Sequence, residues 1–269
     1  MTVFPREICR DETQALAHEW RVTNESTSYA STSIAGAITR RHHGLLVAPL
    51  DGSGALTVTL AKVDEEIEVD GQQYKLGTNE YVGNVIEPDG YLYLQQVSFD
   101  GTIAEFIYEA GRFHLTKTIW LGQGHNTTFV RYTLAEHSAP IRLTLIPLCD
   151  YRVRETLTQG SEQLRFHIQR LERGLQVTAF EGAVPYRLLV APQFDFTPLD
   201  LWYWRFQLRG ENNAAADLYV PGLVRAQVAP GTSFTLIATT ESDDKIDFDS
   251  WRALERARAR RTTPTTPQN

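Results

Sequence analysis

Short hydrophobic runs recur along the chain, and β-branched and aromatic residues fill most of them. In one run Leu143 and Leu145 share a face, while Arg142 and Thr144 point the other way, as in a half-buried strand. This two-residue period predicts a chain made mostly of strands. The runs that predict strands lie at residues 44–50, 55–69, 91–99, 103–108, 112–121, 127–134, 141–148, 164–171, 175–180, 186–191, 223–228 and 233–239.

Asp-Gly and Pro-Gly pairs separate many of these runs and favour tight turns. Helical periodicity is confined to residues 12–18 and 248–261. Strands that follow one another without intervening helices exclude a βαβ design and favour two packed antiparallel sheets. The predicted fold class is therefore all-β, a large antiparallel β-sandwich with a short C-terminal helix.

The predicted C-terminal helix has recognisable start and end signals. Asp247 or Asp249 can cap its first turn. Trp251 and Leu254 fall three residues apart, on one face of the helix. Arginines crowd its end, where positive charge suits the helix dipole.

Residues 262–269 consist mostly of threonine and proline, a composition that cannot form a core. Such a tail is typical of an interdomain linker or of an ordinary frayed terminus. We expect one β-sandwich domain over residues 1–245, followed by a helix and a linker or tail over residues 246–269.

Composition limits the partners and the location. The chain has 269 residues, of which 42% are hydrophobic and 22% charged, as in an ordinary globular protein. Its formal net charge of −7 argues against a nucleic-acid partner. No run approaches the roughly 20 apolar residues that cross a bilayer, so no membrane partner is expected, and the start lacks a signal peptide. Cys9 and Cys149 are too few for a disulfide framework, so the predicted location is the cytoplasm.

The densest polar cluster is Arg40-Arg41-His42-His43, at the entrance to an apolar stretch. These side chains could hold a carboxylate or sugar hydroxyls, or satisfy buried polar groups and an acid at an interface. Because neighbours along a strand point to opposite faces, His42 and His43 could not both bind one metal ion. Since no further histidine or cysteine lies at ligand spacing, neither a metal nor a cofactor is expected.

A second cluster, Trp202-Tyr203-Trp204-Arg205-Phe206, is rich in aromatic residues. On a strand, Trp202, Trp204 and Phe206 would share one face. If exposed, they would suit stacking against sugar rings. If buried, they would belong to the core or to a domain interface, because aromatic side chains bury large areas.

Acidic residues are plentiful, but no pair is marked as catalytic. Asp64, Glu65, Glu66 and Glu68 form one run, which is typical of a solvated strand face or turn. Glycoside hydrolysis normally needs two carboxylates that face the scissile bond. The sequence also lacks GxSxG, HExxH and P-loop motifs, so it predicts no catalytic residue.

Several stretches resemble the opening signature of the N-terminal domain of bacterial and archaeal glycogen debranching enzymes. They are EWRVTN at 19–24, YAS at 29–31, IAGA at 34–37 and TRRHHGLLVA at 39–48. The similarity continues downstream and reaches about Thr239. Its downstream parts lie at residues 126–134, 142–152, 202–206 and 217–222.

The resemblance implies a galactose-mutarotase-like β-supersandwich. In amylo-α-1,6-glucosidases this domain packs against a catalytic (α/α) barrel, which carries the acid and base carboxylates. It therefore implies an accessory domain in glycogen catabolism, without catalytic residues, that supports a barrel in cis or in trans and helps border the α-glucan site. The residues expected to face the glucan or the barrel are Asn24, Tyr29, Arg40, Arg41, His42, His43, Trp202, Trp204, Asp217 and Tyr219.

A second hypothesis is a stand-alone carbohydrate-binding or scaffold protein without catalytic activity. An accessory domain would hydrolyse glucan only together with its barrel, whereas a carbohydrate-binding protein would bind glucan by itself. A mutarotase-like epimerase ranks third, because no His/Glu pair is placed convincingly.

Overall fold

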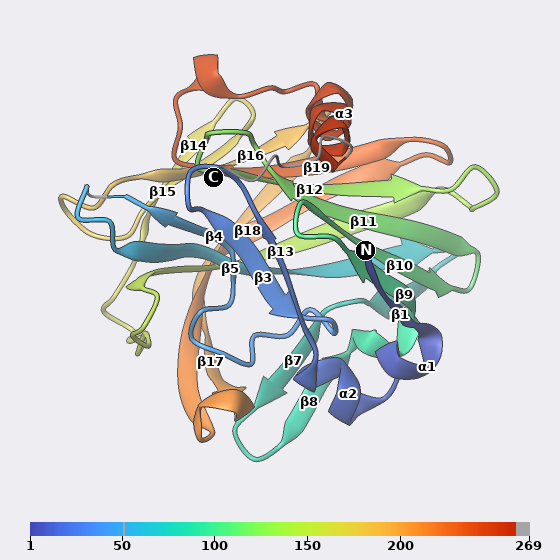
Figure 1. Ribbon diagram of the computed structural model, residues 1–269, viewed down its shortest axis with the longest axis horizontal. Coiled ribbons are helices and arrows are strands. Elements are labelled where there is room, and N and C mark those ends of the chain that lie inside the picture. The colour runs from blue at the N-terminus through green and yellow to red at the C-terminus, as the bar shows by residue number, and fades with distance from the viewer. Residues whose placement is uncertain (51, 262–269) are drawn as a thin grey trace, which may run out of the picture.

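The computed structural model describes residues 1–50 and 52–261 and contains two packed antiparallel sheets (Figure 1). The first sheet has nine strands in the order β1-β9-β10-β11-β12-β19-β16-β15-β14. Its strands are β1 (Thr2–Pro5), β9 (Leu94–Phe99), β10 (Ile103–Ala110), β11 (Phe113–Leu121), β12 (Thr127–Leu134), β14 (His167–Leu171), β15 (Gly174–Thr178), β16 (Tyr186–Ala191) and β19 (Ser233–Thr239).

The second sheet has ten strands in the order β2-β3-β4-β5-β13-β18-β17-β7-β8, with β6 paired to β5. Its strands are β2 (Glu19–Thr23), β3 (Tyr29–Ser33), β4 (Gly44–Pro49), β5 (Leu56–Val69), β6 (Gln72–Lys75), β7 (Thr78–Tyr81), β8 (Val85–Asp89), β13 (Ile141–Val153), β17 (Asp195–Leu208) and β18 (Ala214–Val228).

Helices are few and short in the described chain. The α-helices are α1 (Arg6–Cys9), α2 (Glu12–Ala17) and α3 (Ser250–Arg261), and the 3₁₀ turns are η1 (Gly90–Tyr93), η2 (Arg209–Glu211) and η3 (Asp243–Lys245). The predicted all-β sandwich with a C-terminal helix is therefore confirmed. None of the helices in residues 1–50 and 52–261 is long and apolar enough to cross a membrane.

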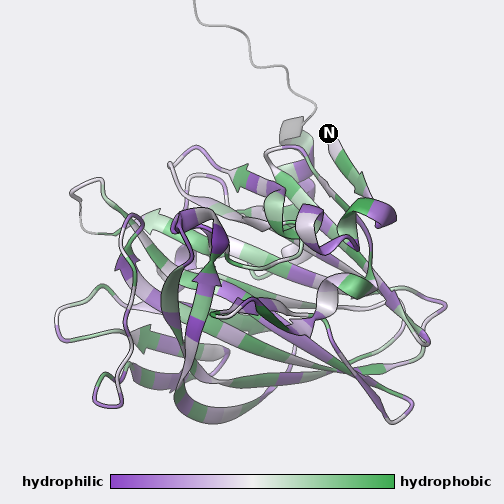
Figure 2. Ribbon diagram, turned by 90° about the horizontal axis from the view of Figure 1, so that it is seen from below, coloured by the Kyte–Doolittle hydropathy of each residue, from purple (hydrophilic) through white to green (hydrophobic). Residues whose placement is uncertain are grey.

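The main core lies between the two sheets. Figure 2 shows hydrophobic and hydrophilic residues alternating along many strands, as expected where one face of a sheet is buried. Trp20 on β2 meets Phe106 on β10 edge to face, with ring centroids 5.5 Å apart. Cys9 and Cys149 are both buried as free thiols, and burial raises the pKa of Cys149 to about 12.

The second sheet also curls on itself and encloses a smaller core. Ile146, Phe206 and Leu218, from three different strands, belong to this cluster. The curl brings β7 over β5, where the buried Lys62 ammonium donates to the Thr78 carbonyl at 2.7 Å. Lys62 also pairs with Asp64 on the same strand at 2.7 Å, and the Asn79 amide on β7 donates to Asp64 at 2.6 Å, so hydrogen bonds from this buried ion pair link the two strands.

A second buried ion pair crosses between the sheets. Lys117 Nζ on β11 lies 2.6 Å from Glu65 Oε1 on β5, and the Tyr132 hydroxyl donates to the same oxygen at 2.7 Å. The prediction of a solvated acidic run was therefore wrong for Asp64 and Glu65, which are buried. Strand periodicity alone cannot distinguish an exposed acid from a buried one whose charge is matched by a buried lysine, which is on the same strand for Asp64 and on a distant strand for Glu65.

The longer hydrophobic runs were predicted well. Residues 127–134, 186–191 and 233–239 coincide with β12, β16 and β19. The strands missed are short, and several lie at edges where little apolar area is buried, so they carry weak periodicity. They are β1, β2, β3, β6, β7 and β8. The long strand β17 was not among the predicted runs either, although residues 202–206 were considered as a strand.

Helix α3 packs on the outer face of the first sheet (Figure 1). Asp249 caps it by accepting the N–H of Arg252 at 3.1 Å, as one of the two expected capping choices. Leu254 is buried, whereas Trp251 is 56% exposed at the helix edge. Residues 262–269, which contain the predicted Thr/Pro tail, lie outside the described residues. The domain boundary at residue 245 stays a prediction.

The inter-sheet ion pair yields a stability prediction. Replacing Glu65→Gln leaves the buried Lys117 charge without its counter-charge, which should cost about 3–5 kcal/mol of unfolding free energy. Glu68→Gln, on the same strand but in a half-exposed pair with Arg142, should cost less than about 1 kcal/mol. Urea unfolding of the three proteins checks this, and equal losses in the two variants would contradict it.

Candidate functional site

Residues 40–43 lie in the connection between β3 and β4, where the chain turns before β4 begins. The His43 N–H donates to the Arg40 carbonyl at 3.2 Å, and the Thr39 N–H donates to His43 Nδ1 at 3.0 Å. The expectation that His42 and His43 point to opposite faces of a strand was wrong. They lie in a turn instead, and both rings approach one carboxylate.

That carboxylate belongs to Glu19 on β2. Its Oε1 accepts from Arg40 Nε at 2.9 Å. Its Oε2 lies 3.2 Å from His42 Nε2 and 3.3 Å from His43 Nε2. Hydrogen bonding by His42, then by His43 and Arg40, holds the pKa of Glu19 far below its ordinary value, against the opposing effect of burial. Glu19 is therefore a permanent negative charge around which the turn is arranged.

Glu19, His42 and His43 also place three potential metal-ligand atoms within 4.8 Å of one another. A histidine that binds a metal through Nε2 normally donates its Nδ1–H to another group. In His43, Nδ1 instead accepts the Thr39 N–H, so the neutral ring carries its proton on Nε2, the atom that faces Glu19. Burial lowers the pKa of His43 and so favours this neutral form. The geometry suits a cluster of hydrogen-bonded charges better than a metal centre.

Arg152 holds the turn from the opposite side. Its buried guanidinium donates to the Arg41 carbonyl at 2.7 Å and to the Arg154 and Thr156 carbonyls at 2.9 Å. Its Nε donates to the buried Asp150 carboxylate at 2.8 Å. Arg152 thus ties the end of β13 and the loop that follows it to the turn.

Gly210 in η2 lies close against this turn. The Gly210 N–H donates to the Thr39 carbonyl at 3.1 Å, and the Arg40 guanidinium donates to the Gly210 carbonyl. A Cβ atom at Gly210 would lie 1.9 Å from Arg40 Nη1, so Arg40 would have to leave its place. The contact between η2 and the turn therefore depends on this small residue.

A cleft of about 520 Å³, here called the arginine cleft, opens beside the turn. It is lined by Arg21, Tyr29, Arg41, His42, Arg154, Glu155 and Glu211. The fully buried Tyr29 donates its hydroxyl to the His42 carbonyl at 2.7 Å, and the Arg21 guanidinium lies 3.9 Å above its ring. Three of the predicted residues, Tyr29, Arg41 and His42, therefore line one cleft, in which Tyr29 is a buried part of the wall.

The carboxylates of the cleft are paired with arginines. Glu155 accepts from Arg154 at 2.6 Å, and this bond lowers the pKa of Glu155. Glu211 lies 3.5 Å from Arg41 Nε. A glycosidase acid needs a raised pKa, so Glu155 is tuned in the opposite direction. What the cleft offers is guanidinium donors, which suit a carboxylate, a phosphate or sugar hydroxyls.

Trp202 and Tyr219 form a second cluster, on β17 and β18. Trp202 is 4% exposed and packs edge-on against Tyr219, with ring centroids 5.4 Å apart. Its indole N–H donates to the Leu164 carbonyl at 2.9 Å, and the buried Tyr219 donates its hydroxyl to Asp200. Both predicted residues therefore belong to the inter-sheet core.

Asp217 stabilises an irregularity in β17. Its Oδ1 accepts the Arg205 N–H at 2.7 Å, and its Oδ2 accepts the Gly160 N–H at 2.9 Å. Arg205 has a φ of +64°, and the pairing register of β17 and β18 shifts there. The buried carboxylate therefore supports a β-bulge.

This bulge overturns the expected aromatic stripe. Trp202 packs in the inter-sheet core, whereas Phe206 packs in the smaller core inside the curled sheet. The extra residue at the bulge moves Phe206 to the other face. Trp204 is 44% exposed and lies beside Trp202, with ring centroids 6.2 Å apart.

The loop after β13 connects the two clusters. At its start the Glu155 carbonyl accepts from Arg41 Nη1 at 3.2 Å. Further along, the Thr158 hydroxyl donates to Asp150, and the Thr158 carbonyl accepts the Asp217 N–H at 3.1 Å. Hydrogen bonds of this loop therefore connect the arginine cleft to the Trp202 cluster.

Asn24, the remaining predicted residue, lies in neither cluster. Its amide donates to the Gly122 carbonyl at 2.8 Å and to the His125 carbonyl at 2.7 Å. It thereby ties the β2–β3 turn to the β11–β12 turn of the other sheet.

Comparison with known proteins identifies the family. A family model described as "Glycogen debranching enzyme N terminal" matches residues 18–235, most of the chain. The chain belongs to this family. The sequence of this chain matched no curated protein.

Two solved structures similar to this domain are those of larger proteins. One is a bacterial glucoamylase complexed with acarbose, with 9% identity and a TM-score of 0.42, covering 90% of this chain and 33% of that one. The other is a polysaccharide lyase, with 15% identity and a TM-score of 0.32, covering 82% and 33%. This chain spans about a third of the length of each.

Several polar groups that build the site of this debranching-enzyme domain were not predicted from the sequence. Glu19 opened the family signature but was not selected as a site residue. Arg152 and Arg154 alternate at the end of a predicted strand, a pattern that could have marked one polar face. Glu211 carries no local signal, since only the tertiary fold brings η2 to the turn.

The Glu19 cluster predicts a pH-dependent stability. Glu19→Gln should lower the unfolding free energy at pH 7 by about 1–3 kcal/mol, because charge-assisted bonds are lost. The folded-state pKa of Glu19 lies below its ordinary value of 4.5, so its contribution is complete above pH 4.5 and lost as pH falls further. The difference between wild type and variant in urea unfolding should therefore shrink below pH 4.5. Glu109→Gln, at an exposed position, is the control, and a difference independent of pH would refute the assignment.

Proposed function

We propose that this chain is the accessory N-terminal domain of a cytoplasmic glycogen debranching enzyme, active in α-glucan catabolism. It supports a catalytic (α/α) barrel, supplied in cis or in trans, and borders the glucan site. The observation that carries the proposal is the family match over residues 18–235. The ordered turn at residues 40–43 adds a surface that is prepared for docking.

Electrostatics favours the arginine cleft as the docking surface. The chain as a whole has a formal charge of −7, yet Arg21, Arg41 and Arg154 meet at this one cleft. Arg41 is 41% exposed and Arg154 35%, so their guanidiniums keep donors available to a partner. A carboxylate-bearing segment of the barrel is the complement that these groups fit best.

The assignment as non-catalytic rests on the state of the carboxylates. Glu19 and Glu155 are hydrogen-bonded to cations that lower their pKa values, so neither is prepared to donate a proton. The chain alone should therefore release no glucose from a limit dextrin, measured with a coupled glucose assay. Glucose release by the purified chain would overturn the accessory role.

Docking gives a second test. A barrel domain of the family, produced separately, should bind this chain with an affinity that falls as salt rises. Replacing Arg21→Gln and Arg154→Gln together should weaken binding roughly tenfold or more, by loss of charge-assisted bonds. Arg142→Gln, a surface arginine paired with Glu68, is the matched control. Equal affinities for all three proteins would exclude the arginine cleft as the docking surface.

A stand-alone carbohydrate-binding role is the second candidate, and Trp204 favours it. This half-exposed indole lies beside Trp202 and could stack against a sugar ring. In that case millimolar maltoheptaose should shift the tryptophan fluorescence, and Trp204→Ala should abolish the shift. No response of the wild-type chain would exclude this role.

A further inference from the structure

The curled second sheet carries two adjoining hollows on the face that also bears the smaller core. Their volumes are about 190 Å³ and about 170 Å³, and Glu66 on β5 lines both of them. Tyr81 and Tyr203 line the larger hollow and pack against the smaller core. The two hollows, here called the sheet groove, share no described residue with the arginine cleft and form a separate surface.

The strand register places polar side chains in a row across this face. Glu66 pairs with Lys75 on β6 and, on its other side, with Thr144 on β13. Thr144 pairs in turn with Arg225 on β18. Glu66 and Arg225 are therefore two strand spacings apart, roughly 10 Å, with the Thr144 side chain between them. One extended ligand can contact all three.

The two groups that flank Thr144 have unused hydrogen-bonding capacity. Among the described residues, neither Glu66 nor Arg225 takes part in an ion pair, and no side-chain hydrogen bond involves Glu66. Arg225 donates from Nη1 to the Thr197 hydroxyl at 2.7 Å, which leaves other N–H groups of its guanidinium available. The sheet groove therefore presents a free acceptor and free donors on either side of a hydroxyl.

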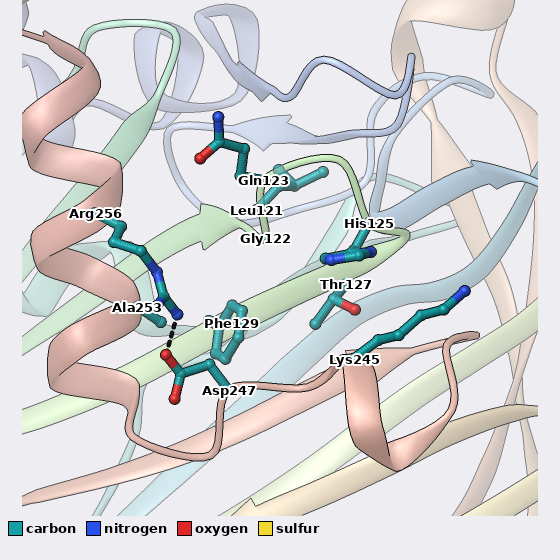
Figure 3. Close-up of a pocket in the computed structure, with 10 residues that line it drawn as sticks. All are labelled: Leu121, Gly122, Gln123, His125, Thr127, Phe129, Lys245, Asp247, Ala253 and Arg256. Atoms are coloured by element: carbon teal, nitrogen blue, oxygen red, sulfur yellow. Dashed lines mark hydrogen bonds and ion pairs between the residues drawn. The ribbon is translucent and has the colours of Figure 1, made fainter.

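The cavity of about 340 Å³ between α3 and the turn that joins β11 to β12 differs in this respect (Figure 3). Its Arg256 pairs with Asp247, and its Lys245 lies 3.3 Å from Glu241. Both cations are thus matched by carboxylates of the protein. The sheet groove is the surface where charged groups remain open to a ligand.

The charges that line the sheet groove balance one another. Asp64 and Glu65 are neutralised by the buried lysines already described. The remaining charged side chains are three cations and three carboxylates, Lys75, Arg142, Arg225, Glu66, Glu68 and Glu87. This balance favours a neutral ligand whose groups both donate and accept hydrogen bonds, and hydroxyls do both.

Tyr203 adds a ring surface beside Glu66 in the larger hollow. Its side chain is half-buried, and burial, then the nearby Asp64 and Glu66 carboxylates, raises its pKa, so the hydroxyl stays protonated. A tyrosine combines an apolar face with a polar tip. The C–H face of a sugar ring fits such a surface, with neighbouring hydroxyls directed to the carboxylate.

We propose that the sheet groove binds two consecutive rings of a neutral oligosaccharide. One ring lies against Tyr203 and donates two neighbouring hydroxyls to Glu66, and the next accepts hydrogen bonds from Arg225 beside Thr144. The choice of an α-glucan as that oligosaccharide rests on the proposed function, whereas the site itself rests on the contacts above.

The test is isothermal titration calorimetry of the whole chain with maltoheptaose and, separately, with the β-linked cellopentaose. Maltoheptaose should give saturable binding at millimolar concentrations. If cellopentaose binds instead and Glu66→Gln weakens it, the sheet groove stands as a sugar site, while the α-glucan assignment of the proposed function is contradicted. No saturable binding of either sugar would overturn the site and would leave the docking test of the arginine cleft unaffected.

Variants on two different strands assign the binding to the sheet groove. Glu66→Gln and Arg225→Gln should each weaken binding by about tenfold or more, because hydrogen bonds to charged groups are replaced by weaker neutral ones. Glu109→Gln, at an exposed position on the other sheet, should bind as the wild type does, and so should Trp204→Ala. Unchanged binding in Glu66→Gln or Arg225→Gln, or loss of binding in Trp204→Ala, would overturn the proposal.

Discussion

The Glu19 carboxylate determines the path of the chain between β3 and β4. It receives Arg40 on one oxygen and faces His42 and His43 with the other, so three side chains of one turn meet at a single charge. Two carbonyls of this turn accept further hydrogen bonds: His42 from the Tyr29 hydroxyl, and Arg41 from the Arg152 guanidinium. The arginine cleft exists because this network holds its walls.

Buried charge has the same role inside the sandwich. Glu65 meets Lys117 between the sheets, and Asp64 meets Lys62 where the second sheet curls over itself. A buried ion pair adds little stability compared with a well-packed apolar pair, yet an unmatched charge is costly. The Glu65–Lys117 pair therefore matters mainly for how β5 lies against the other sheet, and the Lys62–Asp64 pair, which lies within β5, matters through its hydrogen bonds to Thr78 and Asn79 on β7.

The sequence predicted those parts of the fold that depend on local periodicity. Strand β12 was predicted from the two-residue alternation of buried side chains. The Asp249 cap was predicted because capping residues stand at a fixed position before a helix. The bulge at Arg205 was not, since it depends on Asp217 from the next strand. The same limit explains why Asp64 and Glu65 were expected in solvent.

For the candidate site, the family signature contains the turn at residues 40–43, but the geometry of that turn depends on distant residues. Arg41 was predicted, whereas Glu211 and Glu155, which contact it, lie far along the chain. Asn24, Asp217 and Tyr219 were selected with the turn, but they are held by internal hydrogen bonds that order the scaffold. The sequence similarity therefore includes both residues of the turn and residues that stabilise the scaffold, and it does not distinguish between the two groups.

The central claim is that Glu19 orders the turn at residues 40–43 before any partner arrives. Amide hydrogen exchange of the isolated chain at neutral pH tests it directly, with the Thr39 amide as the probe, since that N–H is buried against His43. The account predicts slow exchange at Thr39 in the wild type and fast exchange in Glu19→Gln, with strand β12 protected in both. Fast exchange at Thr39 in the wild type, or equal protection in the variant, would contradict it.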